Sequence, residues 1–141
     1  NSKNVELVKT LGADTVIDYQ TQDFTKTATL FDFIFDAVGK SSFKQCKPLL
    51  TNKGIYISTE LGKNGVNILL ALTTPIGGGK KLLFPLPTIN KKDVIFLKEL
   101  VQSGAFNPVI DRKYNLDQIV EAYKYVESGQ KTGNVILKVA E

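Results

Sequence analysis

The chain has 141 residues, of which 18 are basic and 14 acidic, so its formal charge is +4, and 43% of the residues are hydrophobic. This composition is typical of a soluble globular protein of one domain, and it excludes collagen, coiled coil and extensive disorder. The sequence contains no histidine and one cysteine, Cys46. It therefore excludes a disulfide framework within the chain, a Ser-His-Asp triad, and a metal site of nitrogen and sulfur ligands.

The basic excess does not indicate a nucleic-acid partner. Arg112 is the one arginine, and the lysines are scattered without interleaved stacking aromatics. The longest mostly apolar stretch, residues 66–76, is shorter than the roughly 20 residues that span a bilayer. We therefore expect no nucleic-acid partner, no membrane partner and a cytoplasmic location.

In chain order, the first predicted element is a helix that Ser2 caps, with Val5, Val8 and Leu11 at helical spacing and Gly12 at its end. A short strand is predicted over residues 15–19. Residues 31–38 are nearly continuous apolar, which predicts a strand buried on both faces.

The middle of the chain is less regular. We expect a helix over residues 43–50, of a length that Pro48 leaves open, followed by a buried strand over residues 54–59. Residues 61–80 read as a loop with one short apolar helix. Residues 81–86 read as an extended segment that Pro85 confines to a sheet edge or a strand end.

The last third alternates again. A helix is predicted over residues 91–103, an extended segment over residues 107–113, and a second helix that Asn115 caps and Gly129 ends, with Gln118 completing a capping box. A β-branched strand over residues 134–139 closes the chain. Strands separated by helices predict an α/β protein with a parallel sheet.

In such sheets ligands bind beyond the carboxyl ends of the strands. Gly39 follows an apolar strand there, and it is either a ligand-facing glycine or a plain turn glycine. The stretch of residues 77–81 fails as a phosphate loop, because Thr74 stands where a glycine is needed and Lys81 where Ser or Thr is needed. No GxGxxG turn is present in the sequence.

Two further residue types invite a catalytic interpretation. Asp32 and Asp36 lie on one face of the predicted strand, but near its two ends, so we favour a strand-start residue and a hydrogen-bonded strand-end residue over an acid–base pair. Cys46 has no histidine partner in the chain, and we interpret it as a buried small apolar residue.

Several segments resemble the medium-chain dehydrogenases and reductases. The run from Asn4 to Tyr19, with Leu11-Gly12-Ala13-Asp14 and Ile17-Asp18-Tyr19, is similar to a characteristic segment of that superfamily. Residues 31–39 resemble its fourth strand, and residues 108–111, 121–123 and 129–135 resemble its C-terminal pattern. The nearest branch is the zinc-free quinone-oxidoreductase-like group, whose members reduce quinones, enals or enones with NADPH.

The resemblance implies NADP(H) as the cofactor of the whole protein and assigns residues to it. Lys3, between Ser2 and Asn4, matches a lysine that meets the adenosine 2′-phosphate, as a cation at a helix start would. The other matched positions, each of which could equally be a turn or packing residue, are Tyr19 at the adenosine, Val38 and Gly39 at the ribose and nicotinamide, Ser58, Thr59 and Gly62 in the loop after the fifth strand, Phe84 near the nicotinamide and the dimer seam, and Asn134 near the middle of the cofactor. No catalytic residue and no metal ligand is implied.

The resemblance also implies that the chain, which has no methionine and begins with Asn1, is part of a longer protein. Residues 1–141 would be the C-terminal part of a nucleotide-binding domain, a partial doubly wound (Rossmann-type) parallel sheet without the first two strands and the glycine-rich turn. We expect the incomplete sheet to pair with another copy, as a homodimer or strand-exchanged oligomer, or to rearrange.

These expectations define two functional hypotheses. In the first, the whole protein transfers hydride to a small-molecule quinone, enone or related carbonyl compound, while the 141-residue chain alone is inactive and binds no cofactor. In the second, the chain is a non-enzymatic nucleotide-binding or oligomerisation module.

Overall fold

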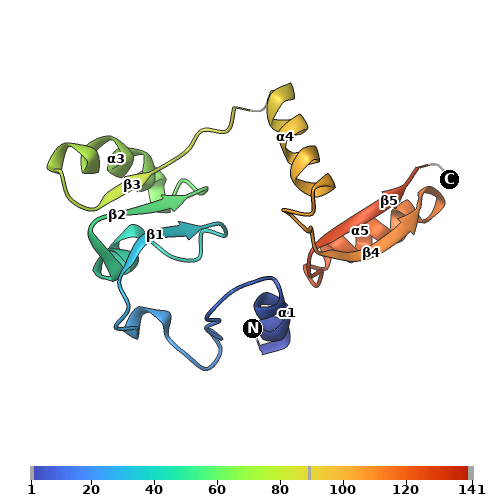
Figure 1. The fold of residues 1–141 in the computed structure, drawn as a ribbon, viewed down its shortest axis with the longest axis horizontal. Coiled ribbons are helices and arrows are strands. Elements are labelled where there is room, and N and C mark those ends of the chain that lie inside the picture. The colour runs from blue at the N-terminus through green and yellow to red at the C-terminus, as the bar shows by residue number, and fades with distance from the viewer. Residues whose placement is uncertain (1, 89, 140–141) are drawn as a thin grey trace. The chain divides into compact units, whose positions relative to one another are not determined.

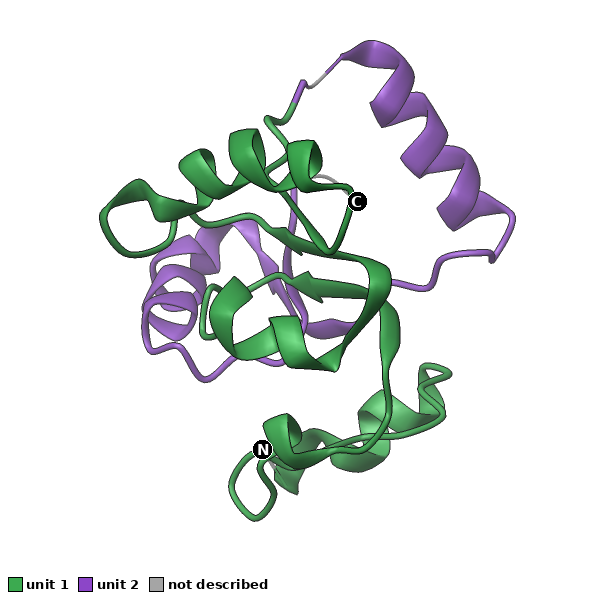
Figure 2. Cartoon of the chain, turned by 90° about the vertical axis from the view of Figure 1, so that its left-hand side faces the viewer, with its two compact units in different colours: residues 1–87 green, residues 88–141 purple. Residues whose placement is uncertain are grey.

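The structure of the chain, a computed structural model, describes residues 2–88 and 90–139 (Figure 1). The chain divides into two compact units, residues 1–87 and residues 88–141 (Figure 2). Among the described residues, no helix is long and apolar enough to cross a membrane. Each unit is described by itself.

The first unit is built on a three-stranded sheet with the order β1-β2-β3, and both pairs of strands are parallel. Its helices and strands are α1 (Val5–Thr10), β1 (Phe31–Asp36), α2 (Phe43–Cys46), β2 (Leu50–Ser58), α3 (Val66–Thr73) and β3 (Lys81–Leu83). Short 3-10 turns precede α1 and α3 and follow α2 and α3. The parallel sheet and the alternation of strands and helices confirm the predicted α/β class.

The core of this unit lies on one face of the sheet. Ile34, Tyr56 and Leu82 stand side by side in the register of the three strands, and Tyr56 and Leu82 are fully buried. Helix α2 covers them with Phe43 and Cys46. Cys46, 1% exposed, is the buried small residue that the sequence indicated.

The opposite face of β1 corrects the sequence prediction. Phe33 and Phe35, which alternate with Ile34 and so point to the other side, are 53% and 56% exposed rather than buried. Within residues 2–88 and 90–139, strand β1 pairs with β2 alone and therefore lies at an edge of the sheet. An apolar run predicts a buried strand only when elements cover both of its faces, and here the described core lies on one.

Two predictions near the N-terminus are wrong. Residues 15–19 form no strand: residues 15–18 have no regular secondary structure, Tyr19 lies in a turn, and no described strand pairs with them. Ser2 does not cap a helix: it begins a 3-10 turn (Ser2–Asn4), and α1 follows Asn4, whose side chain makes no capping hydrogen bond. The Ser2 hydroxyl is instead bound by a partner sixteen residues later, as described below.

The second unit contains α4 (Lys91–Gln102), β4 (Ile110–Asn115), α5 (Ile119–Glu127) and β5 (Asn134–Lys138), with β4 and β5 parallel. The predicted capping box of Asn115 and Gln118 is present at the turn that leads into α5. The Asp111 carboxylate accepts hydrogen bonds from the Tyr125 hydroxyl at 2.8 Å and from the Thr132 backbone N–H at 2.6 Å. These contacts fasten α5 and the following turn to β4.

Candidate functional site

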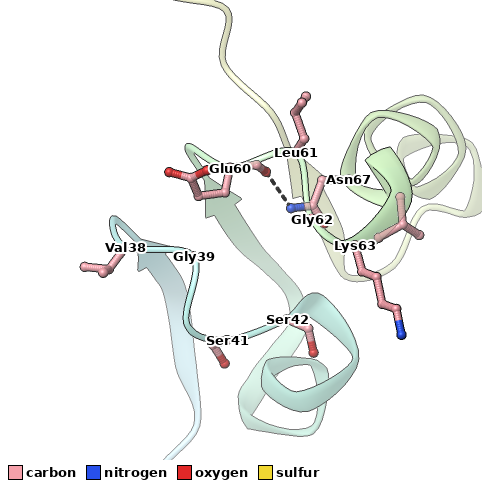
Figure 3. Close-up of a pocket in the computed structure, with 10 residues that line it drawn as sticks. Val38, Gly39, Ser41, Ser42, Glu60, Leu61, Gly62, Lys63 and Asn67 are labelled. Carbon is pink, nitrogen blue, oxygen red and sulfur yellow. Dashed lines mark hydrogen bonds between the residues drawn. The ribbon is translucent and has the colours of Figure 1, made fainter.

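A cleft of about 480 Å³ opens beyond the carboxyl ends of β1 and β2 (Figure 3). One side is the segment of residues 38–42 that follows β1, here called the β1 loop. Another side is the segment of residues 60–63 that follows β2, here called the β2 loop. The start of α3 completes the lining, which consists of Val38, Gly39, Ser41, Ser42, Glu60, Leu61, Gly62, Lys63, Val66 and Asn67.

The β1 loop is held by a single carboxylate at the end of β1. Oδ1 of Asp36 accepts hydrogen bonds from the backbone N–H groups of Gly39 at 2.8 Å and Val38 at 3.2 Å. Oδ2 accepts from the backbone N–H of Ser41 at 3.3 Å and from the Tyr56 hydroxyl at 2.8 Å. Asp36 is thus the hydrogen-bonded strand-end residue that the sequence indicated, and its carboxylate fixes the path of the loop.

These contacts shift two pKa values. Partial burial alone would raise the pKa of Asp36, but the hydrogen bonds from Tyr56 and the three backbone N–H groups outweigh it, and the pKa lies below its usual value. Burial, together with the hydrogen bond to Asp36, raises the pKa of Tyr56 far above its usual value. The pair is therefore an ionised carboxylate and a neutral phenol at neutral pH.

The β2 loop is held by neutral groups instead. The Ser58 hydroxyl, 1% exposed as a residue, accepts a hydrogen bond from the Glu60 backbone N–H at 3.2 Å. The Asn67 amide donates to the Glu60 carbonyl at 2.7 Å, the contact drawn in Figure 3, and the Asn67 backbone N–H donates to the Leu61 carbonyl at 3.1 Å. Asn67 is 5% exposed, so a buried amide anchors this loop.

Glycine is required once in each loop. Gly39 has φ +67°, and a Cβ there would lie 2.4 Å from Cγ of Glu60. Gly62 has φ +71°, and a Cβ there would lie 2.9 Å from Cγ of Asn67. Both backbone conformations are left-handed, a region that residues with a side chain rarely adopt. Without a Cβ, Gly39 can lie against the Glu60 side chain and Gly62 against the Asn67 side chain.

The structure brings some of the predicted cofactor residues together. Val38, Gly39 and Gly62 line the cleft. Ser58 supports the β2 loop from below, and the exposed Thr59 donates its backbone N–H to the Asp36 carbonyl at 3.4 Å. These positions therefore lie around the carboxyl ends of β1 and β2, the edge at which parallel sheets bind ligands.

Other predicted residues lie elsewhere. The Ser2 hydroxyl donates a short hydrogen bond to Asp18, and the Ser2 backbone N–H donates to the Gln20 side-chain oxygen at 3.4 Å, which ties the segment of Lys3 and Asn4 to the turn that carries Tyr19. The hydrogen bond from Ser2 lowers the pKa of Asp18. Lys3 is exposed and Tyr19 is 70% exposed.

Two predicted positions do not line the cleft. Phe84 is half-buried and packs against the core cluster of the first unit. Asn134 belongs to the second unit, where its side-chain amide donates to the Val109 carbonyl at 3.1 Å.

Sequence reasoning missed several residues that line the cleft: Ser41, Ser42, Lys63, Val66 and Asn67. Asn67 carried a usable signal, since it is a lone amide inside an otherwise apolar run and a buried amide needs a partner. Ser42 also carried one, as the cap of α2 whose hydroxyl accepts from the Gln45 backbone N–H at 3.3 Å. Nothing in the sequence indicated that Ser41 and Lys63 would line the cleft, because their positions depend on the path of each loop.

The sequence profile described as zinc-binding dehydrogenase matches residues 11–137. The chain is 33% identical over 135 residues to 2-methylene-furan-3-one reductase of Solanum lycopersicum, covering 94% of this chain and 30% of that protein. It is 30% identical over 141 residues to Quinone-oxidoreductase QR1, chloroplastic, of Triphysaria versicolor, covering 97% of this chain and 43% of that protein. The chain thus spans less than half the length of these relatives.

Solved structures agree with this at the level of the fold. A quinone oxidoreductase from Coxiella burnetii matches with a TM-score of 0.74 at 24% identity, over 99% of this chain and 43% of that one. The crystal structure of AibC matches with a TM-score of 0.76 at 17% identity, over 100% of this chain and 44% of that one. The partial doubly wound fold is therefore confirmed.

The metal in the family's description does not fit these residues. The chain has no histidine, and its one cysteine is buried beneath α2. Across residues 2–88 and 90–139, no three Cys, Asp or Glu side chains gather as a metal would require.

With an α/β fold, a cleft at the carboxyl ends of its strands and a profile match over most of its length, the chain belongs to the zinc-binding dehydrogenase family, in the quinone-oxidoreductase-like part of the medium-chain dehydrogenases and reductases.

Proposed function

We propose that the chain is part of an NADPH-dependent oxidoreductase that transfers hydride to a quinone, an enone or a related carbonyl compound. The observation that carries this proposal is the cleft of about 480 Å³ at the carboxyl ends of β1 and β2, which Val38, Gly39 and Gly62 help to line. The printed names of relatives, which include a quinone oxidoreductase and an NADPH-dependent alkenal/one oxidoreductase, support the same class of reaction.

A nicotinamide cofactor supplies the hydride when it is bound, and the protein positions it. In this proposal, Val38, Gly39 and Gly62 contact the nicotinamide half, with Ser58 and Thr59 behind them. The segment Ser2–Asn4 and Tyr19 contact the adenosine half. In the same proposal, Phe84 lies near the nicotinamide and Asn134 near the middle of the cofactor. No GxGxxG turn is present among the 141 residues to hold the pyrophosphate, so these residues form only part of the site.

The preference for NADPH over NADH rests on Lys3. An exposed ammonium group can pair with a 2′-phosphate, whereas a carboxylate in its place would favour the free ribose hydroxyls of NADH. The hydrogen bonds from Ser2 to the 18–20 turn hold Lys3 close in the fold to Tyr19. Lys3 would then bind the 2′-phosphate while Tyr19 contacts the adenosine.

Calorimetric titration of the whole protein with NADPH and NADH tests this assignment. We expect NADPH to bind about tenfold more tightly or better, as one charge-assisted contact provides. Lys3→Ala should remove the preference, whereas the control Lys9→Ala, an exposed lysine paired with Glu6 at 3.0 Å, should keep it. Equal binding of the two cofactors, or no binding, would contradict the proposal.

We also propose that the 141-residue chain is inactive by itself. A spectrophotometric assay of NADPH oxidation with a quinone should show no turnover above background for this chain. Turnover by the chain alone would overturn this statement without affecting the cofactor assignment.

The second candidate is a non-enzymatic nucleotide-binding or oligomerisation module. It is favoured by the uncovered face of β1, with Phe33 and Phe35 more than half exposed, which suits pairing with another copy as a homodimer or strand-exchanged oligomer. Light scattering would give the oligomeric state. The gene sequence upstream of Asn1 separates the two candidates. A GxGxxG turn about one βαβ unit upstream, with a longer domain before it, would establish the enzyme, whereas a start codon just before Asn1 would favour the module.

A cytoplasmic location for the whole protein also remains our proposal, based on the single buried thiol, which suits a reducing compartment. Some relatives carry the words chloroplastic or mitochondrial in their names. Cell fractionation with an antibody against the chain would distinguish these compartments.

A further inference from the structure

The carboxylate of Asp36 gathers more hydrogen bonds than any other described side chain of the first unit. It accepts from three backbone N–H groups of one short segment and from one phenol. These donors belong to Val38, Gly39 and Ser41, all of which line the cleft. Asp36 itself does not line the cleft, so it affects a ligand only through the β1 loop.

We propose that Asp36, supported by Tyr56, is a positioning residue that fixes the β1 loop as the wall on which a ligand is received. Four charge-assisted hydrogen bonds to one group define the loop path more tightly than solvent contacts would. The Tyr56 hydroxyl fixes the carboxylate in turn, because its ring is fully buried and packs 5.9 Å from the Phe43 ring. The buried Tyr56 therefore holds Asp36 in place, and Asp36 holds the β1 loop at the cleft.

These hydrogen bonds determine which ligand groups the β1 loop can bind. The backbone N–H groups of Val38, Gly39 and Ser41 donate to Asp36, so they are not available to a phosphate oxygen. A backbone cradle for an anion needs free N–H groups. The β1 loop therefore receives an uncharged part of a ligand. The proposal rests on the proposed function only for the identity of that ligand, the nicotinamide cofactor.

The first test needs no ligand. In the full chain, the amide signals of Val38, Gly39 and Ser41 should titrate together in ¹H–¹⁵N spectra, with a midpoint below 3.8, the usual aspartate value. Tyr56 and Cys46, which lie close to Asp36, both have raised pKa values, so neither titrates in this range. The Glu60 carboxylate lies beside Gly39, so the titration is read in Glu60→Gln as well as in the wild type. Added inorganic phosphate should leave the three signals in place. Independent titration, or a shift with phosphate, would overturn the proposal.

The second test uses variants of the whole protein. Asp36→Asn removes the charge and one acceptor oxygen, so NADPH binding should weaken about tenfold and the shared titration should vanish. The matched control Asp32→Asn changes the other carboxylate of β1, which accepts from the Thr51 hydroxyl at 2.8 Å and lies outside the cleft, and should leave binding unchanged. Tyr56→Phe keeps the loop contacts and should weaken binding less.

The outcomes separate the two proposals. If wild-type protein binds no NADPH, the proposed function fails, while the amide titration still decides the role of Asp36. If NADPH binds and Asp36→Asn binds it equally well, the positioning role is wrong and the proposed function stands. If Asp36→Asn does not fold, Tyr56→Phe and the wild-type titration decide.

Discussion

The two loops of the cleft are fixed by different means. The β1 loop depends on one ionised carboxylate, that of Asp36, which accepts hydrogen bonds from three backbone N–H groups of the loop. The β2 loop depends on two neutral side chains, Ser58 and Asn67, both of which are buried. Ionic support is sensitive to pH, whereas neutral support is sensitive to packing. The two sides of the same cleft should therefore fail under different conditions.

The largest effects on the free energy of unfolding are expected when the two cleft glycines, Gly39 and Gly62, are replaced by alanine. A side chain at Gly62 meets Asn67, which is buried and hydrogen-bonded, so Gly62→Ala should lower the free energy of unfolding by about 2–3 kcal/mol. A side chain at Gly39 meets Glu60, which is exposed and can swing away, so Gly39→Ala should cost about 1–2 kcal/mol. Urea denaturation followed by circular dichroism gives both values.

Gly65→Ala is the control for this pair. Gly65 has φ +73° with open space around it, so this variant measures backbone strain alone. If Gly62→Ala costs no more than Gly65→Ala, the buried amide does not make the β2 loop rigid, and the contrast between the loops is wrong.

A somewhat smaller effect is expected when the amide anchor is removed. Asn67→Ala leaves the Glu60 carbonyl without the Asn67 donor, which should cost about 1–3 kcal/mol of the free energy of unfolding. Because no charge is involved, the loss should be the same at pH 7 and at pH 4. A loss that changes with pH between these values would show that the β2 loop also depends on an ionised group.

The smallest effect is expected from acid. A pKa that is lowered on folding means that the carboxylate stabilises the fold above its unfolded pKa, and that this contribution is lost as pH falls through the folded value. Below pH 3.8, amide exchange should accelerate in the β1 loop before it does in the β2 loop. Hydrogen exchange read by mass spectrometry on peptides covering each loop would measure this. Simultaneous loss of protection in both loops would contradict the contrast.

Features with local causes could be predicted from the sequence. The capping box of Asn115 and Gln118 needs side chains only three residues apart, and it is present. Helix α4 and strand β3 begin where their residue patterns indicate. The positions of Gly39 and Gly62 beyond the carboxyl ends of β1 and β2 could also be predicted, because each follows directly from where an apolar strand ends.

Features that depend on distant parts of the chain could not be predicted. Ser2 has the residue type of a helix cap, but its hydroxyl binds Asp18, and no local pattern reveals that partner. The burial of β1 was overestimated because hydrophobicity does not say which elements cover a strand. Ser41 reaches the cleft through the path that Asp36 imposes on its loop, which only the fold discloses.

The edge of β1 that no described strand pairs with also bears on how the 141-residue chain would behave in solution. Residues 31–35 combine aromatic and β-branched side chains with a free row of backbone hydrogen-bonding groups, a composition that favours cross-β assembly. The negative charges of Asp32 and Asp36, spaced along this strand, act as gatekeepers, since stacking identical strands in register would place like charges together. Acid strong enough to neutralise Asp36, whose pKa lies below its usual value, should therefore convert the same strand into a nucleus for fibrils.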